Sequence, residues 1–113
     1  MSLPNFNKFE TYQRNGFARR FTFTINGVVQ DITGYDIKFI VKVNDTDEDV
    51  VFVKQLVLTS PLDGIADLVL TRQDTNIAIG TYVAAVEIRA THGGEPVSIR
   101  GLFCVYQNVL ENQ

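Results

Sequence analysis

The sequence predicts an all-β fold, an Ig-like Greek-key β-sandwich of about seven to eight antiparallel strands. Apolar and polar residues alternate in several short segments, and none of these segments keeps a helical period. Turn-forming residues separate the segments at regular spacing. In the stretch 71–88, a turn leads into an alternating strand that opens with Tyr82, as in the strand before last of such sandwiches. At most one short helical turn is expected, near residues 72–76.

The length and composition predict a single folded domain. A chain of 113 residues can build one hydrophobic core but hardly two. Its hydrophobic fraction of 45% is typical of a globular protein and argues against disorder. Residues 9–113 are therefore expected to form one β-sandwich domain, preceded by a flexible N-terminal arm at residues 1–8.

The first predicted strands form a hairpin. Residues 19–25 alternate, with Phe21, Phe23 and Ile25 together on the face expected to be buried. The Asn-Gly dipeptide at 26–27 readily adopts the positive φ angles of a tight hairpin turn. Residues 28–32 are then the short return strand.

The middle of the chain supplies three more strands. Residues 35–43 alternate, and Ile40 falls on the outer face, which suggests cover by a neighbouring loop or partner. Residues 50–58 alternate poorly, which is typical of an edge strand or of a segment that changes sheets. Residues 65–70 follow a turn formed by Pro and Gly. The predicted core residues of these strands are Ile37, Phe39, Val41, Val43, Ala66, Leu68 and Leu70.

The last two strands follow a capped turn. Thr71 and Asp74 have the spacing of a capping box, and Gly80 interrupts the chain before the next strand. Tyr82 is predicted to be a corner residue whose hydroxyl bonds back toward the turn at Asp74. These four residues are assigned structural roles. The predicted core residues of the two strands are Tyr82, Ala84, Val86, Ile88, Val97, Ile99, Phe103 and Val105.

Charge and composition exclude several classes of function. The net charge is −3 and the basic residues are scattered, so nucleic-acid binding has no electrostatic basis. No apolar run approaches the roughly 18 residues that span a bilayer, and the N-terminus lacks the pattern of a secretory signal. Membrane insertion is therefore not expected. The single cysteine, Cys104, excludes an internal disulfide.

The nearest approach to a basic cluster is formed by Arg14, Arg19 and Arg20. Alternation sends Arg19 and Arg20 to opposite faces of a regular strand, so they cannot form one patch. We interpret them as a charged edge that discourages aggregation between sheets.

The loop at 44–49 is the one candidate metal site. Asp45, Asp47 and Asp49 lie at alternate positions and could offer three oxygen ligands to calcium. An EF-hand also needs a glycine and a glutamate where this chain has Val50 and Leu56. A solvated hairpin loop is the preferred interpretation, and neither a metal nor another cofactor is expected.

The sequence offers no catalytic constellation. His92, the only histidine, lies beside two glycines in a predicted hairpin tip, where nothing would orient it as a general base. Cys104 has no histidine or basic neighbour that would lower the pKa of its thiol, so a packed structural thiol is expected. An enzyme is therefore not predicted.

Five short segments, in chain order, carry a resemblance. They are DITGYDIKFIVK at 31–42, PLDGIADLVLT at 61–71, the Asp-Thr pair at 74–75, GTY at 80–82 and GLF at 101–103. In this order they resemble the N-terminal domain of the baseplate upper protein family of tailed phages, over residues 17–109. The resemblance implies a small β-sandwich that is part of a phage or prophage tail. It transfers no catalytic residue.

Two functions follow. The leading one, implied by the resemblance, is a structural or assembly module of a phage tail that is made in the bacterial cytoplasm and incorporated into the virion. It would act through protein–protein contacts, and Ile40 and Leu102 on outer faces could be buried against tail proteins or in a homo-oligomer. The alternative is a carbohydrate-binding or calcium-dependent adhesion module, for which Tyr12, Tyr35 and Tyr106 are the candidate platform residues.

Overall fold

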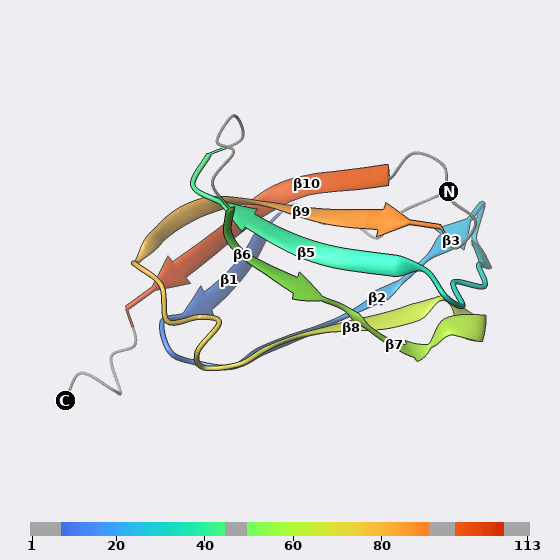
Figure 1. The fold of residues 1–113 in the computed structure, drawn as a ribbon, viewed down its shortest axis with the longest axis horizontal. Coiled ribbons are helices and arrows are strands. Elements are labelled where there is room, and N and C mark those ends of the chain that lie inside the picture. The colour runs from blue at the N-terminus through green and yellow to red at the C-terminus, as the bar shows by residue number, and fades with distance from the viewer. Residues whose placement is uncertain (1–7, 45–49, 91–96, 108–113) are drawn as a thin grey trace.

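The computed structural model describes residues 8–44, 50–90 and 97–107, which form a two-layer β-sandwich (Figure 1). One layer is a five-stranded sheet with the order β1-β10-β9-β5-β6, and the other is a three-stranded sheet with the order β2-β8-β7. A separate two-stranded sheet pairs β3 with β4. The strands are β1 (Lys8–Tyr12), β2 (Phe17–Thr22), β3 (Thr24–Ile25), β4 (Val28–Val29), β5 (Asp36–Lys42), β6 (Val50–Gln55), β7 (Val57–Ser60), β8 (Ile65–Leu70), β9 (Gly80–Arg89) and β10 (Val97–Tyr106).

The predicted all-β sandwich is confirmed, but the prediction that every strand pair is antiparallel is wrong. β1 pairs parallel with β10, in a register that places Phe9 beside Phe103. β1 itself was not predicted, because Phe9 is its only large apolar core residue and the other buried position is Thr11. Residues 1–7 of the predicted arm lie outside the described residues, and Lys8 is already the first residue of β1.

The predicted Asn-Gly turn is confirmed, although the strands around it are shorter than expected. Asn26 and Gly27 both have positive φ, 50° and 81°, and they join β3 to β4 as a two-residue hairpin loop. The predicted strand at 19–25 is interrupted at Phe23, whose N–H bonds to the carbonyl of Gly64 instead of a sheet partner. Phe21 and Phe23 are both buried, as predicted.

The predicted core residues of β5 are confirmed, except at the end of the strand. Ile37, Phe39 and Val41 are fully buried, whereas Val43 is exposed. The cause is a register shift in the β5–β6 pairing between Val41 and Lys42, after which β5 ends.

The poorly alternating segment at 50–58 changes sheets, as one of its two interpretations proposed. β6 is an edge of the five-stranded sheet, and β7 is an edge of the three-stranded sheet. Leu56 lies between them, is buried, and donates its N–H to the carbonyl of Ile37 at 2.9 Å. β6 and β7 therefore face the same core from different layers. For this reason the segment 50–58 has no single alternation of apolar and polar residues.

The helical turn lies elsewhere than predicted. Within the described part of the chain, the only helical element is the short 3₁₀ helix η1 (Pro61–Asp63), while residues 72–75 form a hydrogen-bonded turn. Pro61 presets the helical φ at the start of η1, and Gly64 ends it in the left-handed conformation at φ 71°. A Cβ at Gly64 would lie 2.7 Å from the carbonyl oxygens of Phe23 and Gln30, so the turn also needs the space that glycine leaves.

The final strand is buried only in its second half. Phe103 and Val105 are buried, as predicted, and Ile99 packs partly against the core. Val97 was predicted to be buried and is exposed; it is the first residue of β10, in the half of the strand that has no β1 neighbour.

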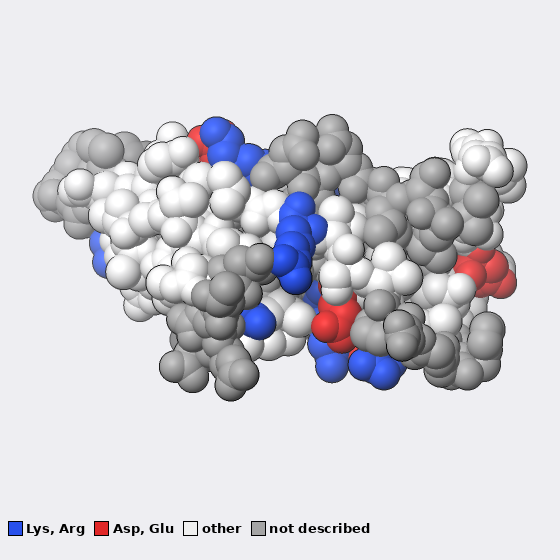
Figure 2. All heavy atoms as spheres, turned by 90° about the horizontal axis from the view of Figure 1, so that it is seen from above, with Lys and Arg blue, Asp and Glu red and all other residues white. Residues whose placement is uncertain are grey.

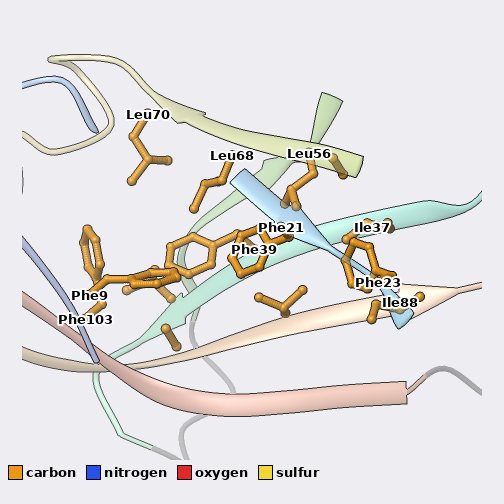
Figure 3. Packing of buried hydrophobic residues seen from close by; sticks show 14 of the residues in the cluster. Phe9, Phe21, Phe23, Ile37, Phe39, Leu56, Leu68, Leu70, Ile88 and Phe103 are labelled. Atoms are coloured by element: carbon orange, nitrogen blue, oxygen red, sulfur yellow. The ribbon is translucent and has the colours of Figure 1, made fainter. Parts of the chain in front are cut away.

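Phenylalanines fill the centre of the sandwich (Figure 3). The ring of Phe39 contacts those of Phe9 and Phe103, with centroid distances of 5.9 and 5.6 Å. Phe17 and Phe52 pack partly against the same group. Such tilted and edge-on contacts are the arrangements that aromatic rings prefer, and they contribute about 1 kcal/mol per pair beyond the burial of area.

Candidate functional site

The outer face of the five-stranded sheet, which points away from the other layer, carries a continuous group of apolar side chains. We call Val53, Ile40, Ala85, Val83 and Leu102 the apolar stripe. The register places Ile40 between Val53 and Ala85, and Val83 beside Leu102, so the stripe crosses four neighbouring strands. Val53 is 50% exposed and Leu102 is 42% exposed. Ile40 and Leu102 therefore lie on this outer face, as alternation predicted.

Charged and polar side chains border the apolar stripe. Lys42, Glu87, Ser98 and Arg100 line a shallow hollow of about 140 Å³ together with residues of the stripe. Figure 2 looks down on this side of the molecule and shows a broad uncharged surface next to a band of Lys and Arg side chains. An apolar centre with a polar border is the usual composition of a protein-binding surface.

The same face also carries two exposed tyrosines at its β1 end. Parallel pairing of β1 with β10 places Tyr12 beside Tyr106, with ring centroids 6.2 Å apart and planes inclined by 54°. Tyr12 is 53% exposed and Tyr106 is 41% exposed. We call these two residues the tyrosine pair. Tyr35, the third candidate platform residue, is not part of it and packs partly against the core.

A carboxylate is attached to the tyrosine pair. The hydroxyl of Tyr106 donates to Glu10 Oε2 at 2.7 Å, and Lys8 Nζ lies 3.6 Å from Glu10 Oε1. The hydrogen bond to Glu10 raises the pKa of Tyr106 to about 12. The same hydrogen bond, followed by the charge of Lys8, lowers the pKa of Glu10. Sequence reasoning missed Glu10 because it lies on β1, 96 positions away from Tyr106.

The capping box at Thr71 and Asp74 is present. Asp74 Oδ2 accepts the N–H of Thr71 at 2.8 Å, and Thr71 Oγ1 accepts the N–H of Asp74 at 3.2 Å. Lys54 of β6 also reaches Asp74, with 2.9 Å between Nζ and Oδ2. Burial alone would raise the pKa of Asp74, but the hydrogen bonds from Thr71 and Lys54 outweigh it and lower the pKa overall.

The hydroxyl of Tyr82 bonds back along the chain in the predicted direction, and its acceptor lies between the turn at Asp74 and the strand. The hydroxyl of Tyr82 donates to the carbonyl of Ala78 at 2.5 Å, rather than to the turn at Asp74. Ala78 lies between that turn and Gly80, which is the first residue of β9. The bond therefore fixes the loop that leads into β9 against the beginning of the strand. Burial raises the pKa of Tyr82.

The three arginines do not form a patch. Arg14 has positive φ and lies in the turn after β1. Arg19 faces the core side of β2, opposite Leu68, and its guanidinium lies 5.3 Å from the ring centroid of Phe9. Arg20 faces outward, where it makes two hydrogen bonds to Asp67, at 2.9 and 3.2 Å. The predicted separation of Arg19 and Arg20 is thus correct, and a charge on the inner side of edge strand β2 discourages pairing with another sheet.

Of the remaining candidate site residues, Cys104 is described by the structure, whereas His92 and the three aspartates of the loop at 44–49 are not. Cys104 is buried, with Sγ 3.9 Å from Thr81 Oγ1, which agrees with a packed structural thiol. Asp45, Asp47 and Asp49, like His92, lie outside the described residues. Among residues 8–44, 50–90 and 97–107, no group of three or more His, Cys, Asp or Glu side chains is arranged to hold a metal ion. No helix in the same residues has the length and apolar character needed to cross a membrane.

Comparison with known proteins finds neither a family model nor a curated protein that matches this chain.

Proposed function

We propose that this protein is a non-enzymatic structural module of a phage or prophage tail, in the baseplate or as a tail adaptor, that acts through contacts with other tail proteins. The observation that carries the proposal is the apolar stripe. Its side chains lie in two adjacent rows of the register, Val53 with Ile40 and Ala85 in one and Val83 with Leu102 in the other, and Val53 and Leu102 are about half exposed. Burial of such a surface against a partner is favourable by about 25 cal/mol for each Å² of apolar area.

The sequence resemblance supports the same proposal through its position in the fold. The segments at 31–42 and 61–71 each contain a turn and the strand that follows it, β5 and β8, and the segment at 80–82 is the beginning of β9. In the first, Asp31 Oδ1 accepts the N–H of Thr33 at 3.0 Å, and Gly34 has a positive φ of 79°. The shared segments thus include two of the turns that direct the chain into a strand, together with the strands that follow them.

We further propose that the sandwich is Ig-like. The order β2-β8-β7 in one sheet and β10-β9-β5 in the other matches the arrangement of the B-E-D and G-F-C strands of that fold, with β6 as an added edge strand. Tyr82 lies near the beginning of β9, the position of the tyrosine corner in the F strand.

The experiment compares two valines that are equally exposed on opposite layers. Val53→Asp places a charge in the apolar stripe, whereas Val69→Asp places one on the outer side of β8, where Val69 is 48% exposed. Each purified variant is mixed with the proteins encoded by the neighbouring genes, and complexes are detected by size-exclusion chromatography with light scattering. We expect wild type and Val69→Asp to form the same complex and Val53→Asp to lose it.

A further inference from the structure

The tyrosine pair combines an exposed aromatic surface with a carboxylate held beside it. Its rings are about half exposed although they lie next to each other, and a carboxylate is held at their side by the hydrogen bond from Tyr106 to Glu10. An exposed aromatic surface beside a fixed polar group is the combination that small binding sites use for affinity and orientation.

The charges around the tyrosine pair favour a neutral ligand. Lys8 Nζ lies 3.6 Å from Glu10 Oε1, so the ammonium balances the carboxylate locally. A cationic ligand, which aromatic rings and a carboxylate could otherwise attract, would have to compete with Lys8.

The hydrogen-bonding character favours a ligand that brings donors. The proton of the Tyr106 hydroxyl is directed to Glu10, so this hydroxyl is no longer free to donate to a ligand. An ionised carboxylate has about four acceptor positions, which leaves Glu10 able to accept further hydrogen bonds. A proline-rich peptide offers mainly carbonyl acceptors, whereas a sugar offers hydroxyl donors around an apolar ring face.

We propose that the tyrosine pair and Glu10 form a binding subsite for a neutral carbohydrate. A sugar ring stacks on the exposed face of Tyr12 or Tyr106, and its hydroxyls donate to the Glu10 carboxylate. This subsite lies on β1 and β10 and does not depend on the partner that the apolar stripe would bind.

The test is a titration followed by NMR chemical shifts of the backbone amides. The probes are maltoheptaose, cellohexaose, chitotetraose and a mannose trisaccharide, with a proline-rich peptide of similar size for comparison. We expect at least one glycan to give saturable shifts centred on Tyr12, Tyr106 and Glu10, and the peptide to give none. Saturation by the peptide alone, or by no glycan of the set, overturns the proposal.

Three variants separate stacking from hydrogen bonding. Tyr12→Ala combined with Tyr106→Ala should weaken glycan binding at least about tenfold, while Leu62→Ala, an exposed apolar change in η1, should leave it unchanged. Glu10→Gln keeps both rings and should weaken binding by less than the double variant does. Equal binding by wild type and the double variant, with a folded circular dichroism spectrum for both, would show that the tyrosine pair is not the site.

Discussion

At the scale of single residues, the hydroxyl of Tyr82 shows how one buried polar group fixes the approach to a strand. Its bond to the carbonyl of Ala78 satisfies both groups, and phenylalanine in its place would leave that carbonyl without this donor. We expect Tyr82→Phe to lower the free energy of unfolding by about 1 kcal/mol, measured by urea denaturation. Tyr12→Phe is the control, because the exposed hydroxyl of Tyr12 can bond to water in either state. Equal stability of the two variants would show that the corner bond contributes nothing.

Substitutions at Gly64 and Gly27 distinguish the energetic cost of backbone strain from the cost of steric overlap. Both have positive φ, but a Cβ at Gly64 would lie 2.7 Å from two carbonyl oxygens, whereas nothing lies within 4 Å of a Cβ at Gly27. Gly27→Ala should therefore cost only the strain, about 1 kcal/mol. Gly64→Ala should cost more than about 2 kcal/mol, because η1 and the chain at Phe23 must also move. Thermal and urea unfolding of the two variants measure the difference, and a smaller loss for Gly64→Ala would contradict the packing described here.

Tyr106 should ionise well above its ordinary range. Its pKa of about 12 follows from the hydrogen bond to Glu10, and an unperturbed tyrosine has a pKa of about 10. Because the folded-state pKa is the higher one, the stabilisation is complete below about pH 10 and is lost as pH rises toward 12. Because burial also raises the pKa of Tyr82, spectrophotometric titration of tyrosinate in the wild type should show more than one late-ionising tyrosine, and Tyr106 is the group whose late ionisation depends on Glu10. In Glu10→Gln this group should ionise earlier, and an unchanged titration would mean that the bond does not form in solution.

At the scale of elements, the capped turn before β9 joins both layers of the sandwich. Asp74 caps the turn and binds Lys54 of β6, while Thr75 is buried and donates its hydroxyl to the carbonyl of Asn15 at 2.7 Å. The turn thus connects an edge strand of one sheet with the segment between β1 and β2. Sequence reasoning identified the capping box but neither of these long-range bonds, since nothing local marks their partners.

Asp74→Asn tests this turn through its pH dependence. The folded-state pKa of Asp74 is lowered below the unfolded value of about 3.9, so its stabilisation is present above that pH and is lost as pH falls through the folded-state value. Asparagine can still accept the cap hydrogen bond but loses the charge that strengthens the bonds from Lys54 and Thr71, so at neutral pH we expect Asp74→Asn to lower the free energy of unfolding by about 1 kcal/mol. Below about pH 4 the difference from wild type should shrink, as followed by urea denaturation over a pH series. A difference that stays constant with pH would exclude the charge of Asp74 as its cause.

The elements that are determined by residues close together in the sequence could be predicted from it. The hairpin at Asn26 and Gly27, the buried alternation of β9 and the capping box all depend on residues a few positions apart. β1 was missed because its identity as a strand depends on parallel pairing with β10, at the other end of the chain. The helical turn was predicted at 72–76 because Thr71 and Asp74 have a capping pattern, but that turn does not continue into a helix, whereas Pro61 begins η1.

The residues of the candidate surfaces can also be divided into those that the local sequence predicts and those that depend on strand pairing. Alternation placed Ile40 and Leu102 on an outer face, but Val53 was not recognised because the β5–β6 pairing contains a register shift and the chain changes sheets after β6. Tyr12 and Tyr106 were candidates by residue type alone, and only the β1–β10 pairing brings them together with Glu10. Residue type and periodicity therefore suggest members of a surface, and the strand order decides which of them are neighbours.

At the scale of the whole molecule, the two layers offer unequal outer surfaces. The outer side of β8 has Asp67 paired with Arg20, and this pair lies next to Val69. The five-stranded sheet instead carries the apolar stripe across its centre and the tyrosine pair at one end. We infer that the three-stranded sheet mainly closes the core, whereas the five-stranded sheet makes the contacts with other molecules.

The most direct measurement is the mass of the complexes that the chain forms with the proteins encoded by its neighbouring genes, determined by light scattering during size-exclusion chromatography. Wild type and Val69→Asp should each bind the same tail protein, and Val53→Asp should bind it at least about tenfold more weakly. The exposed position of Val53 means that the variant itself should stay folded, with a change in stability below about 1 kcal/mol. A wild-type chain that remains a monomer with every one of these proteins, or equal binding by Val53→Asp and Val69→Asp, would contradict the assembly role of the apolar stripe.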